Sequence, residues 1–549
     1  MKSLRSSRLR HWFQSALSWT AWGTLAFLGF AGHLGLASDE QQEPQSRALS
    51  GTVDTANGPV TGVLEGNHYV YRGIPYAAPP IGDMRWRAAA SHANWTSFDA
   101  SHFGNTCPQM LPAGIVGNED CLTLNVWGPA SNVADLLPVI VFLHGGGNST
   151  FDAKGIPTFN TTGEYFSEHG AVLVSVNFRL GALGFMAHPS LDAENIFHIS
   201  GNYGVFDQIA ALLWVAQNIR GFGGDPHNVT LYGFSSGATD ACFLASQPIV
   251  RKLFKRVILS STPHDCDRPT TQAEAENTGN LVVQNAGCSG AADVAACMRA
   301  LPASSIVAAA PPTTPLASPS LWVPVVDNIL FGIPLSSIAQ FNADLRPLMI
   351  GNDEDELGTF FPPSFVPDEA TYAAKLSATF GAAIGAQVLV QYPAAAYPNP
   401  YRAFIAATSD HLYICPARRI ARAYAAASPD NDNGARVYRY LFTHALENSN
   451  PFIGRGAVHT TDLPFTFHTL GMGGLAYTPT AAEQVLSAAM ATTWISFAKK
   501  ASPNNALIPS WRRYDSEADS YLQLNDVMTA EAGVHTAHCD FWDEIDNRN

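Results

Sequence analysis

A serine between two glycines is the strongest chemical signal in this sequence of 549 residues. It is Ser235 in Gly233-Phe-Ser-Ser-Gly237, which follows a strand-like run, 228–232, and precedes a helix-like run, 238–245. Because glycines lack a Cβ, the backbone can make a sharp, strained turn that pushes the serine hydroxyl out of the sheet edge. Free N–H groups at the start of the helix then face any negative charge that forms there. The pattern in this context indicates a nucleophilic serine.

An acid and a base that could activate this serine follow it in the sequence. A serine hydroxyl attacks well only when a base takes its proton, and that base needs a third group to fix its tautomer. On turns of this kind the chain order is serine, acid, histidine. The acidic run Asp353-Glu-Asp-Glu356 follows a buried strand-like segment, and His459 lies in a loop-like segment, 456–464. By residue type alone, each of the four acids, and each of the 17 histidines of the chain, is a candidate.

A glycine run offers hydrogen-bond donors for the negative charge of a tetrahedral intermediate. His144-Gly-Gly-Gly147 directly follows the apolar run 139–143. Backbone N–H groups in such a loop can hold an oxyanion. We therefore expect the run to lie beside Ser235, with His144 as a structural partner of its loop and not as a second base.

The elements that must position these residues alternate between strands and helices. Short apolar runs at 139–143, 171–176, 257–260 and 348–350 are typical of strands that are buried on both faces. Helical spacing of apolar residues appears at 207–220 and 480–499. The alternation predicts an α/β fold with a large, mostly parallel sheet flanked by helices, in one domain from residue 51 to 549. The Ala/Pro-rich stretch 301–320 is interpreted as an extended surface loop.

Composition limits the classes of partner. The formal charge of −15 and the pI near 5.5 argue against nucleic acid as a partner. Eight cysteines, an even number, are consistent with an oxidising compartment. Of four glycosylation sequons, those at Asn94 and Asn160 are the better candidates, because Asn148 and Asn228 lie beside the predicted site.

The N-terminus has the layout of a signal peptide. Lys2, Arg5, Arg8 and Arg10 precede an uncharged stretch that ends in small residues, so we expect residues 1–37 to be removed after Ala37. The alternative is an uncleaved membrane anchor, because the uncharged stretch is about as long as a membrane span. Residues 38–50 are polar and predicted to be flexible. The expected location is extracellular, without stable membrane insertion if the leader is cleaved.

Several longer motifs resemble those of the type-B carboxylesterase/lipase family, which has the α/β-hydrolase fold and includes cholinesterases and fungal lipases. The resemblance covers nearly everything from Gly51 to Glu544. The motifs that carry it are Tyr71-Arg-Gly-Ile-Pro-Tyr-Ala-Ala-Pro-Pro80, Glu119-Asp-Cys-Leu-Thr-Leu-Asn125, Asn177-Phe-Arg-Leu-Gly181, Gly201-Asn-Tyr-Gly204 and Phe222-Gly-Gly-Asp-Pro226. The order of so many motifs makes a chance match very improbable.

The resemblance implies roles for individual residues. Ser235 would be the nucleophile, Glu356 the acid and His459 the base, and the N–H groups of Gly146, Gly147 and Ser236 would form the oxyanion hole. No cofactor is implied. The family's disulfides would pair Cys107 with Cys121, Cys288 with Cys297, and Cys415 with Cys539. Cys242 and Cys266 remain, either as free thiols or as a fourth bridge.

Three positions depart from the family pattern. Phe234 stands where a glutamate is usual, Ser236 where an alanine is usual, and Asn148 where an aromatic residue is usual. Ser236 still supplies its backbone N–H, so we expect the mechanism to survive with an altered substrate shape. Arg179, Asp207, Asp225 and Glu119 are interpreted as ion-pair and capping residues.

The expected function is that of a secreted carboxylic ester hydrolase that acts on small-molecule esters through an acyl-enzyme. The alternatives are a lipase for long-chain esters, a lactone hydrolase or acyltransferase in small-molecule metabolism, and a non-catalytic binding protein on the same scaffold. The loop between Cys107 and Cys121 is short and has no Trp. It therefore favours a general carboxylesterase over a lipase with a long lid or a cholinesterase with a choline-binding Trp.

His535 and His538 beside Cys539 have the residue types of a metal cluster. Cys539 is assigned to a disulfide, and the sequence places no further ligand at a spacing that completes a site. We therefore predict no metal site and interpret the two histidines as surface residues.

Overall fold

The computed structural model describes residues 51–130, 135–155, 159–316, 320–327, 345–427, 436–474 and 476–547. The predicted signal peptide and the polar segment 38–50 lie outside the described residues. Among the residues described, no helix combines the length and the apolar character needed to cross a bilayer.

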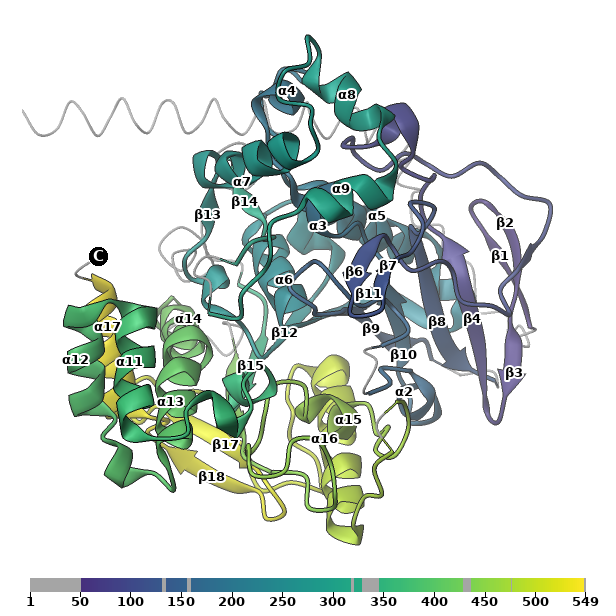
Figure 1. Ribbon diagram of the computed structural model, residues 1–549. Coiled ribbons are helices and arrows are strands. Elements are labelled where there is room, and N and C mark those ends of the chain that lie inside the picture. Colours follow the sequence, from purple (N-terminus) through teal and green to yellow (C-terminus); the bar gives the residue numbers. More distant parts are fainter. Residues whose placement is uncertain are drawn as a thin grey trace, which may run out of the picture.

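A large mixed sheet forms the centre of the molecule (Figure 1). Its strands, in spatial order, are β18 (Thr529–Ala532), β17 (Ser520–Leu524), β16 (Val437–Phe442), β15 (Leu348–Asp353), β12 (Arg256–Ser260), β11 (Gly224–Phe234), β9 (Leu137–Leu143), β10 (Val172–Val176), β8 (Thr123–Pro129), β4 (His68–Pro75) and β3 (Val63–Glu65). The strands from β17 to β10 run parallel to one another. The outer strands at both edges pair antiparallel. The predicted α/β class with a mostly parallel sheet is thus confirmed.

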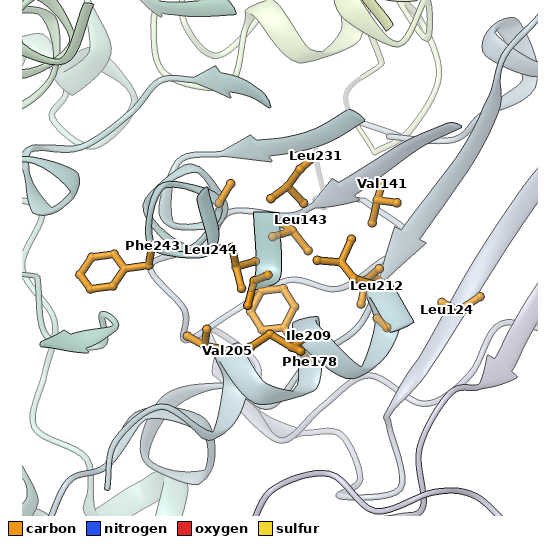
Figure 2. Close-up of a cluster of buried hydrophobic side chains, with 14 of the residues drawn as sticks. Leu124, Val141, Leu143, Phe178, Val205, Ile209, Leu212, Leu231, Phe243 and Leu244 are labelled. Carbon is orange, nitrogen blue, oxygen red and sulfur yellow. The ribbon is translucent and has the colours of Figure 1, made fainter. Parts of the chain in front are cut away.

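The central strands are buried on both faces because their side chains alternate between two cores. Along β9, Val139, Val141 and Leu143 point into one apolar cluster, and Ile140 and Phe142 point into another. This period of two is what a strand imposes on its side chains. Figure 2 shows part of the first cluster, in which Val141 and Leu143 of the sheet meet Ile209 and Leu212 of helix α5 (Tyr203–Asn218).

Helices cover both faces of the sheet. Helices α5, α6 (Ser236–Ser246) and α14 (Cys415–Ala426) contribute buried side chains to the first cluster, and α16 (Ala481–Lys500) to the second. The other helices are α2 (Glu164–Glu168), α3 (Gly181–Phe185), α4 (Pro189–Asp192), α7 (Gln272–Asn285), α8 (Val294–Ala300), α9 (Ala303–Ala309), α11 (Glu369–Phe380), α12 (Ala382–Gln391), α13 (Pro400–Ser409), α15 (Asp462–Thr466) and α17 (Thr536–Asn547). Short strands outside the large sheet are β1 (Thr52–Thr55), β2 (Gly58–Thr61), β5 (Phe98–Asp99), β6 (Gln109–Leu111), β7 (Gly114–Val116), β13 (Thr270–Thr271) and β14 (Val325–Val326).

One local prediction is wrong. The stretch 301–320 was expected to be an extended loop, but it begins with helix α9, which buries Ile306 and Ala309 against the first core cluster. Alanine has the highest helix propensity, and a proline is tolerated at a helix start, so Pro302 can serve as the N-cap.

Four disulfides cross-link the fold. Cys107–Cys121, Cys288–Cys297 and Cys415–Cys539 are paired as the family resemblance implied. Cys242 of α6 pairs with Cys266, which resolves the alternative that the sequence left open in favour of a fourth bridge. The predicted structural ion pairs are present: Arg179 lies 2.6 Å from Asp207, and Arg85 holds Glu119 at 2.6 Å.

Candidate active site

Ser235 occupies a strained turn between β11 and α6. Its φ of 56° and ψ of −125° lie outside the regions that non-glycine residues normally adopt. The flanking glycines are required for space. A Cβ on Gly233 would lie 2.2 Å from the carbonyl oxygen of Gly237, and a Cβ on Gly237 would lie 2.2 Å from that of Leu143. The turn therefore forms only with glycine at both positions, and it lifts the serine above the end of the sheet.

The structure brings Ser235, His459 and Glu356 together in one hydrogen-bonded chain. The Oγ of Ser235 lies 2.9 Å from Nε2 of His459, and Nδ1 of His459 lies 2.5 Å from Oε2 of Glu356. All three residues are buried. A carboxylate at Nδ1 fixes the proton on that nitrogen, so Nε2 is free to accept the proton of the serine hydroxyl.

Glu356 is positioned by the end of strand β15. It begins a short 3-10 turn, Glu356–Thr359, and its Oε1 accepts hydrogen bonds from the N–H of Asp353 at 3.0 Å and from the side chain of Asn352 at 3.3 Å. The loop that carries His459 is tied to the same turn, because the Oγ1 of Thr359 donates to the His459 carbonyl at 2.6 Å. Acid and base are therefore held by one local structure.

Aromatic rings surround the His459 imidazole. The ring centroids of Phe234, Tyr413 and Phe360 lie 4.9, 5.4 and 5.6 Å from its own. Phe234 occupies the position at which the family usually has a glutamate, so the space beside the imidazole is apolar.

The other three acids of the run 353–356 differ in their burial. Asp353 and Asp355 are buried and Glu354 is half-buried. Burial, with the nearby Asp462 carboxylate, raises the pKa of Asp353 well above its usual range. Burial likewise raises the pKa of Asp355 to about 7 against the opposing effect of Arg402, whose guanidinium lies 2.7 Å from its carboxylate.

Asp462 is a buried acid that the sequence reasoning did not place in the site. Burial and the charge of Glu356 raise its pKa to about 8. The available signal was an acidic residue within the apolar segment 457–467, three positions after His459. Burial thus disfavours a charge on Asp353 and on Asp462, whereas the carboxylate of Glu356 contacts the imidazole directly.

The glycine loop lies beside Ser235, as expected. Gly146 and Gly147 have φ values of 104° and 62°, which favour glycine. Within the described part of the chain, no residue accepts a hydrogen bond from the N–H of either glycine. The N–H of Ser236 is the first of helix α6 and has no intrahelical acceptor. His144 stacks on Phe178, with ring centroids 4.6 Å apart, and its Nδ1–H donates to the Gly145 carbonyl at 2.8 Å. This contact fits the structural role predicted for His144.

A buried polar network that the sequence did not predict supports the glycine loop. The side chain of Asn148 donates to one oxygen of Asp240 at 2.9 Å, and Gln208 donates to the other at 2.5 Å. Burial raises the pKa of Asp240 to about 7, although both hydrogen bonds lower it. Asn148 itself is fully buried, in accordance with the expectation that its sequon carries no glycan.

The loop between Cys107 and Cys121 forms a small hairpin of β6 and β7. Gln109 fixes the hairpin to the segment after the glycine loop. Its Nε2 donates to the Phe151 carbonyl at 2.9 Å, and its Oε1 accepts from the Phe151 N–H at 2.8 Å. The hairpin is therefore anchored at its base by the disulfide and by Gln109.

The chain is similar to known proteins over most of its length. Residues 50–542 match the model of the carboxylesterase family. The chain is 32% identical to the phenmedipham hydrolase of Pseudarthrobacter oxydans over 86% of this chain and 94% of that protein. It is 31% identical to the para-nitrobenzyl esterase of Bacillus subtilis (strain 168) over 87% and 96%. A solved structure of a PNB esterase superposes with a TM-score of 0.75 at 29% identity, covering 89% of this chain and 99% of that one.

Proposed function

The chain belongs to the carboxylesterase family and is a carboxylic ester hydrolase, and from this premise we propose that it acts through an acyl-enzyme formed on Ser235. The observation that supports this proposal most is the chain of two hydrogen bonds, 2.9 and 2.5 Å long, that links Ser235 through His459 to Glu356. The strained turn at Ser235 also supports the proposal, because residues in sparsely populated backbone conformations cluster at active sites.

In the proposed acylation step, Nε2 of His459 takes the proton of Ser235 while Oγ forms a bond to the ester carbonyl carbon. The electron pair of the C=O bond moves to the carbonyl oxygen, and that oxyanion accepts hydrogen bonds from the N–H groups of Gly146, Gly147 and Ser236. The carboxylate of Glu356 stabilises the imidazolium through its hydrogen bond to Nδ1. The imidazolium then gives its proton to the leaving alcohol as the C–O bond breaks.

Deacylation repeats the same steps with water. His459 takes a proton from the water as its oxygen attacks the acyl carbon, and the returning proton restores the Ser235 hydroxyl when the carboxylic acid leaves. The residues used are the same in both halves of the cycle, so each half needs the same oxyanion hole.

We further propose that the preferred substrates are small, neutral esters with apolar acyl or alcohol parts. Phe234, Phe360 and Tyr413 around the His459 ring favour such groups. The short hairpin between Cys107 and Cys121 supports a general carboxylesterase over an interfacially activated lipase. Para-nitrobenzyl and p-nitrophenyl esters are suitable test substrates.

Secretion is also part of the proposal, with removal of residues 1–37 and one hydrolase domain from residue 51 onward. Four disulfides support it, because such bonds persist mainly in oxidising compartments. Asn94 is exposed and Asn160 half-buried, so these two are the proposed glycan sites. The side chain of Asn228 instead accepts a hydrogen bond from Arg256.

The proposed mechanism is tested by labelling and by one substitution. A fluorophosphonate is expected to add to Ser235 alone, as shown by peptide mass spectrometry, and p-nitrophenyl butyrate is expected to give a trapped butyryl group on the same residue. Ser235→Ala should abolish both labels and turnover while leaving the folded state intact. Turnover retained in this variant, or a label on another residue, would contradict the assignment of the nucleophile.

A further inference from the structure

A group of metal-ligating side chains lies apart from the Ser235 site, where the C-terminal helix meets the rest of the chain. It consists of Asp410, His535 and His538, and one potential ligand atom from each lies within 4.8 Å of those of the other two. His535 and His538 are predicted from the sequence to be surface residues, because no third ligand is spaced near them along the chain. The structure supplies that ligand from 125 residues earlier in the chain.

Asp410 is the buried centre of the group. It begins a π-helical turn, Asp410–Ile414, between α13 and α14, and its side chain is fully buried. One carboxylate oxygen lies 2.5 Å from Nδ1 of His535, and the other lies 3.2 Å from Nδ1 of His538. Tyr392 also donates a hydrogen bond of 2.9 Å to this carboxylate and fixes its orientation. Single π-turns within helices are frequent at functional sites.

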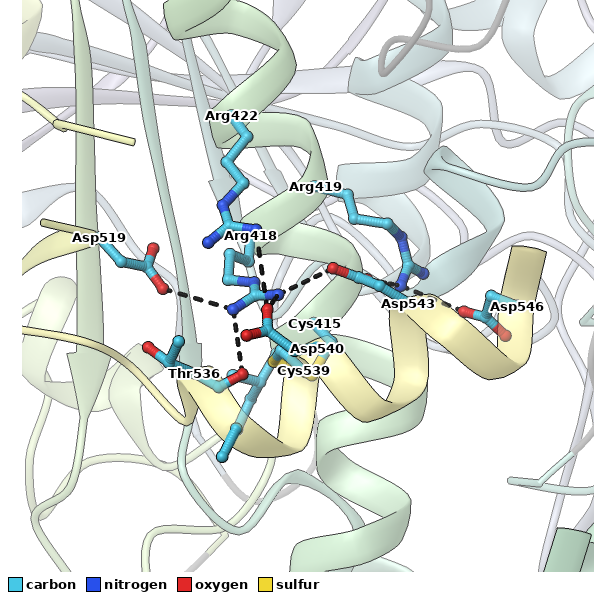
Figure 3. A network of polar contacts seen from close by, with 12 residues as sticks. Cys415, Arg418, Arg419, Arg422, Asp519, Thr536, Cys539, Asp540, Asp543 and Asp546 are labelled. Atoms are coloured by element: carbon cyan, nitrogen blue, oxygen red, sulfur yellow. Dashed lines mark hydrogen bonds and ion pairs between the residues drawn. A yellow bond between two sulfur atoms is a disulfide. The ribbon is translucent and has the colours of Figure 1, made fainter. Parts of the chain in front are cut away.

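Both histidines are held by a rigid attachment of the C-terminal helix. His535 directly precedes α17, and His538 lies one turn further along it. The disulfide Cys415–Cys539 and the ion pairs of Arg418 with Asp540 at 2.6 Å and Asp543 at 2.8 Å fasten α17 to α14 (Figure 3). The three side chains are therefore presented by two elements whose relative position is fixed by covalent and ionic links.

The group is open to solvent on one side. A cavity of about 500 Å³ is lined by Asp410, His535 and His538, together with Glu354 and Tyr397. The side chains of His535 and His538 are 25% and 29% exposed. An ion could therefore enter from the cavity and keep a water molecule on that side. Arg402 also lines the cavity, but it is paired with Asp355, and Glu354 is a further acid in the wall.

The ligand types select the kind of ion. Two imidazoles and one carboxylate suit Zn²⁺ and similar transition-metal ions, whereas Mg²⁺ and Ca²⁺ prefer oxygen ligands alone. Bond lengths of about 2.0–2.2 Å around a tetrahedral Zn²⁺ separate neighbouring ligand atoms by about 3.4 Å. The two separations of 2.5 and 3.2 Å need to increase by less than about 1 Å, which small rotations of the two partly exposed histidine side chains can provide.

We propose that Asp410, His535 and His538 form a Zn²⁺-binding site that fastens helix α17 to the junction of α13 and α14, with its fourth position open to the cavity. This site is separate from the triad, so it does not depend on the proposed function. The competing explanation is a cluster in which Asp410 accepts hydrogen bonds from the two imidazoles and no metal binds. Zn²⁺ competes with protons for the imidazole nitrogens, so binding is best measured at alkaline pH.

The test is a zinc titration of the full chain after treatment with a chelator, monitored by calorimetry and by competition with a chromogenic zinc indicator. The native chain should bind one more equivalent of Zn²⁺ than His538→Ala, or bind that equivalent roughly tenfold or more tightly, because loss of a ligand costs at least as much as loss of a residue that supports one. The control is His227→Ala, at an exposed histidine in β11, which should bind like the native chain. Mg²⁺ in excess should not compete.

Thermal unfolding gives a second measurement. Zn²⁺ should raise the Tm of the native chain and of His227→Ala, and raise that of His538→Ala clearly less, since an ion that binds only the folded state stabilises it. Esterase activity in His538→Ala shows that this variant is folded. Equal zinc stoichiometry and affinity in the native chain and in His538→Ala would overturn the proposal and leave the hydrogen-bonded cluster as the explanation.

Discussion

The backbone N–H of Asn148 donates a hydrogen bond of 3.0 Å to the side-chain oxygen of Ser236. The two residues belong to different elements, the glycine loop after β9 and the first turn of α6. Both differ from the residue that the family usually has, and they contact each other. The bond sets the spacing between the N–H groups of Gly146 and Gly147 on one side and that of Ser236 on the other.

Ser236→Ala should therefore slow ester hydrolysis, although the side chain of Ser236 does not react. The substitution leaves the buried N–H of Asn148 without its acceptor, which should lower the free energy of unfolding by about 1–3 kcal/mol. We expect kcat to fall about tenfold with little change in KM, less than the 10²–10³-fold that loss of a donor costs. Ser246→Ala removes a buried hydroxyl from the other end of α6 and is the matched control. Native kcat in Ser236→Ala would show that the bond does not position the loop.

Glu356→Gln and Asp353→Asn should have opposite outcomes, although both replace a buried acid by its amide. At position 356 the amide cannot stabilise the imidazolium and favours the wrong tautomer, so kcat should fall by about 10⁴-fold. At position 353 burial raises the pKa of the acid and so disfavours its charged form, and replacement by the neutral amide should therefore change kcat by less than about threefold. Steady-state kinetics on p-nitrophenyl butyrate measure both. A larger loss of kcat in Asp353→Asn than in Glu356→Gln would show that Asp353, and not Glu356, is the acid that supports His459.

The pKa of Asp240 predicts a dependence of stability on pH. Its pKa is about 7 in the folded chain and 3.8 in the unfolded one, so between these values the folded state holds a proton that the unfolded state has released. This contribution to the free energy of unfolding therefore decreases as the pH rises from about 4 to 7. Asp240→Asn lacks the titration, so its stability relative to the native chain should increase by up to about 4 kcal/mol over that interval, at roughly 1.4 kcal/mol per unit.

Urea unfolding of both chains at several pH values measures this difference. The variant is expected to fold, because the side-chain oxygen of Gln208 has no partner among the described residues and can accept from the new amide once Gln208 turns over. Asp368→Asn is a control for which the stability difference should change with pH in the opposite direction. Asp368 is an exposed N-cap whose pKa is lowered by the N–H of Thr371, so its variant should lose relative stability as the pH rises through about 4. If the difference in stability between Asp240→Asn and the native chain does not change with pH, the raised pKa of Asp240 is contradicted.

Activity should rise smoothly when a substrate passes its solubility limit. A lid must swing aside at an oil surface, but the hairpin of β6 and β7 is closed by Cys107–Cys121 and held by Gln109. Initial rates on tributyrin, measured below and above saturation, test this expectation, with a known interfacially activated lipase as the positive control. An abrupt increase in rate at the emulsion would show that another segment acts as a lid.

Acetylcholine should be a poor substrate in comparison with its neutral analogue, 3,3-dimethylbutyl acetate. The two esters have the same shape and differ in charge. Phe234 replaces the usual glutamate, and burial raises the pKa of Asp353 and of Asp462, which disfavours negative charge on both, so a cation finds little to attract it beside the imidazole. The ratio of the two kcat/KM values is the measurement. A higher kcat/KM for acetylcholine than for the neutral analogue would show that other residues form a subsite that binds cations.

Much of the site could be predicted because its parts are local patterns. The turn at Ser235, the glycine run and the strands that lead into them are each encoded by neighbouring residues, and the structure has them where the sequence predicts them. Glu356 and His459 needed the family resemblance, since four adjacent acids and 17 histidines are equivalent by residue type. The structure places these two within hydrogen-bonding distance, whereas their catalytic roles stay predictions until they are tested.

What could not be predicted depends on contacts between distant segments. The burial of Asp353 and Asp355 follows from loops that pack over them, and an acidic run has the same composition whether or not it is covered. Asp410 joins His535 and His538 only because α17 returns to α14 at the end of the chain. In the stretch 301–320, the prolines on both sides of helix α9, Pro302 and Pro311, obscured the helix propensity of the alanines between them. The contacts of Ile306 and Ala309 with the core explain why the helix forms.

The antiparallel strands at the margins of the sheet also affect how the protein behaves at high concentration. The apolar runs of β9 and β10 would be prone to intermolecular pairing if either formed the border of the sheet. Instead, the borders are β3 and β18, which are three and four residues long and carry Glu65 and Glu531. Such short, charged borders offer few free backbone groups to a second chain, so the architecture that holds the serine in place also disfavours the growth of one sheet onto another.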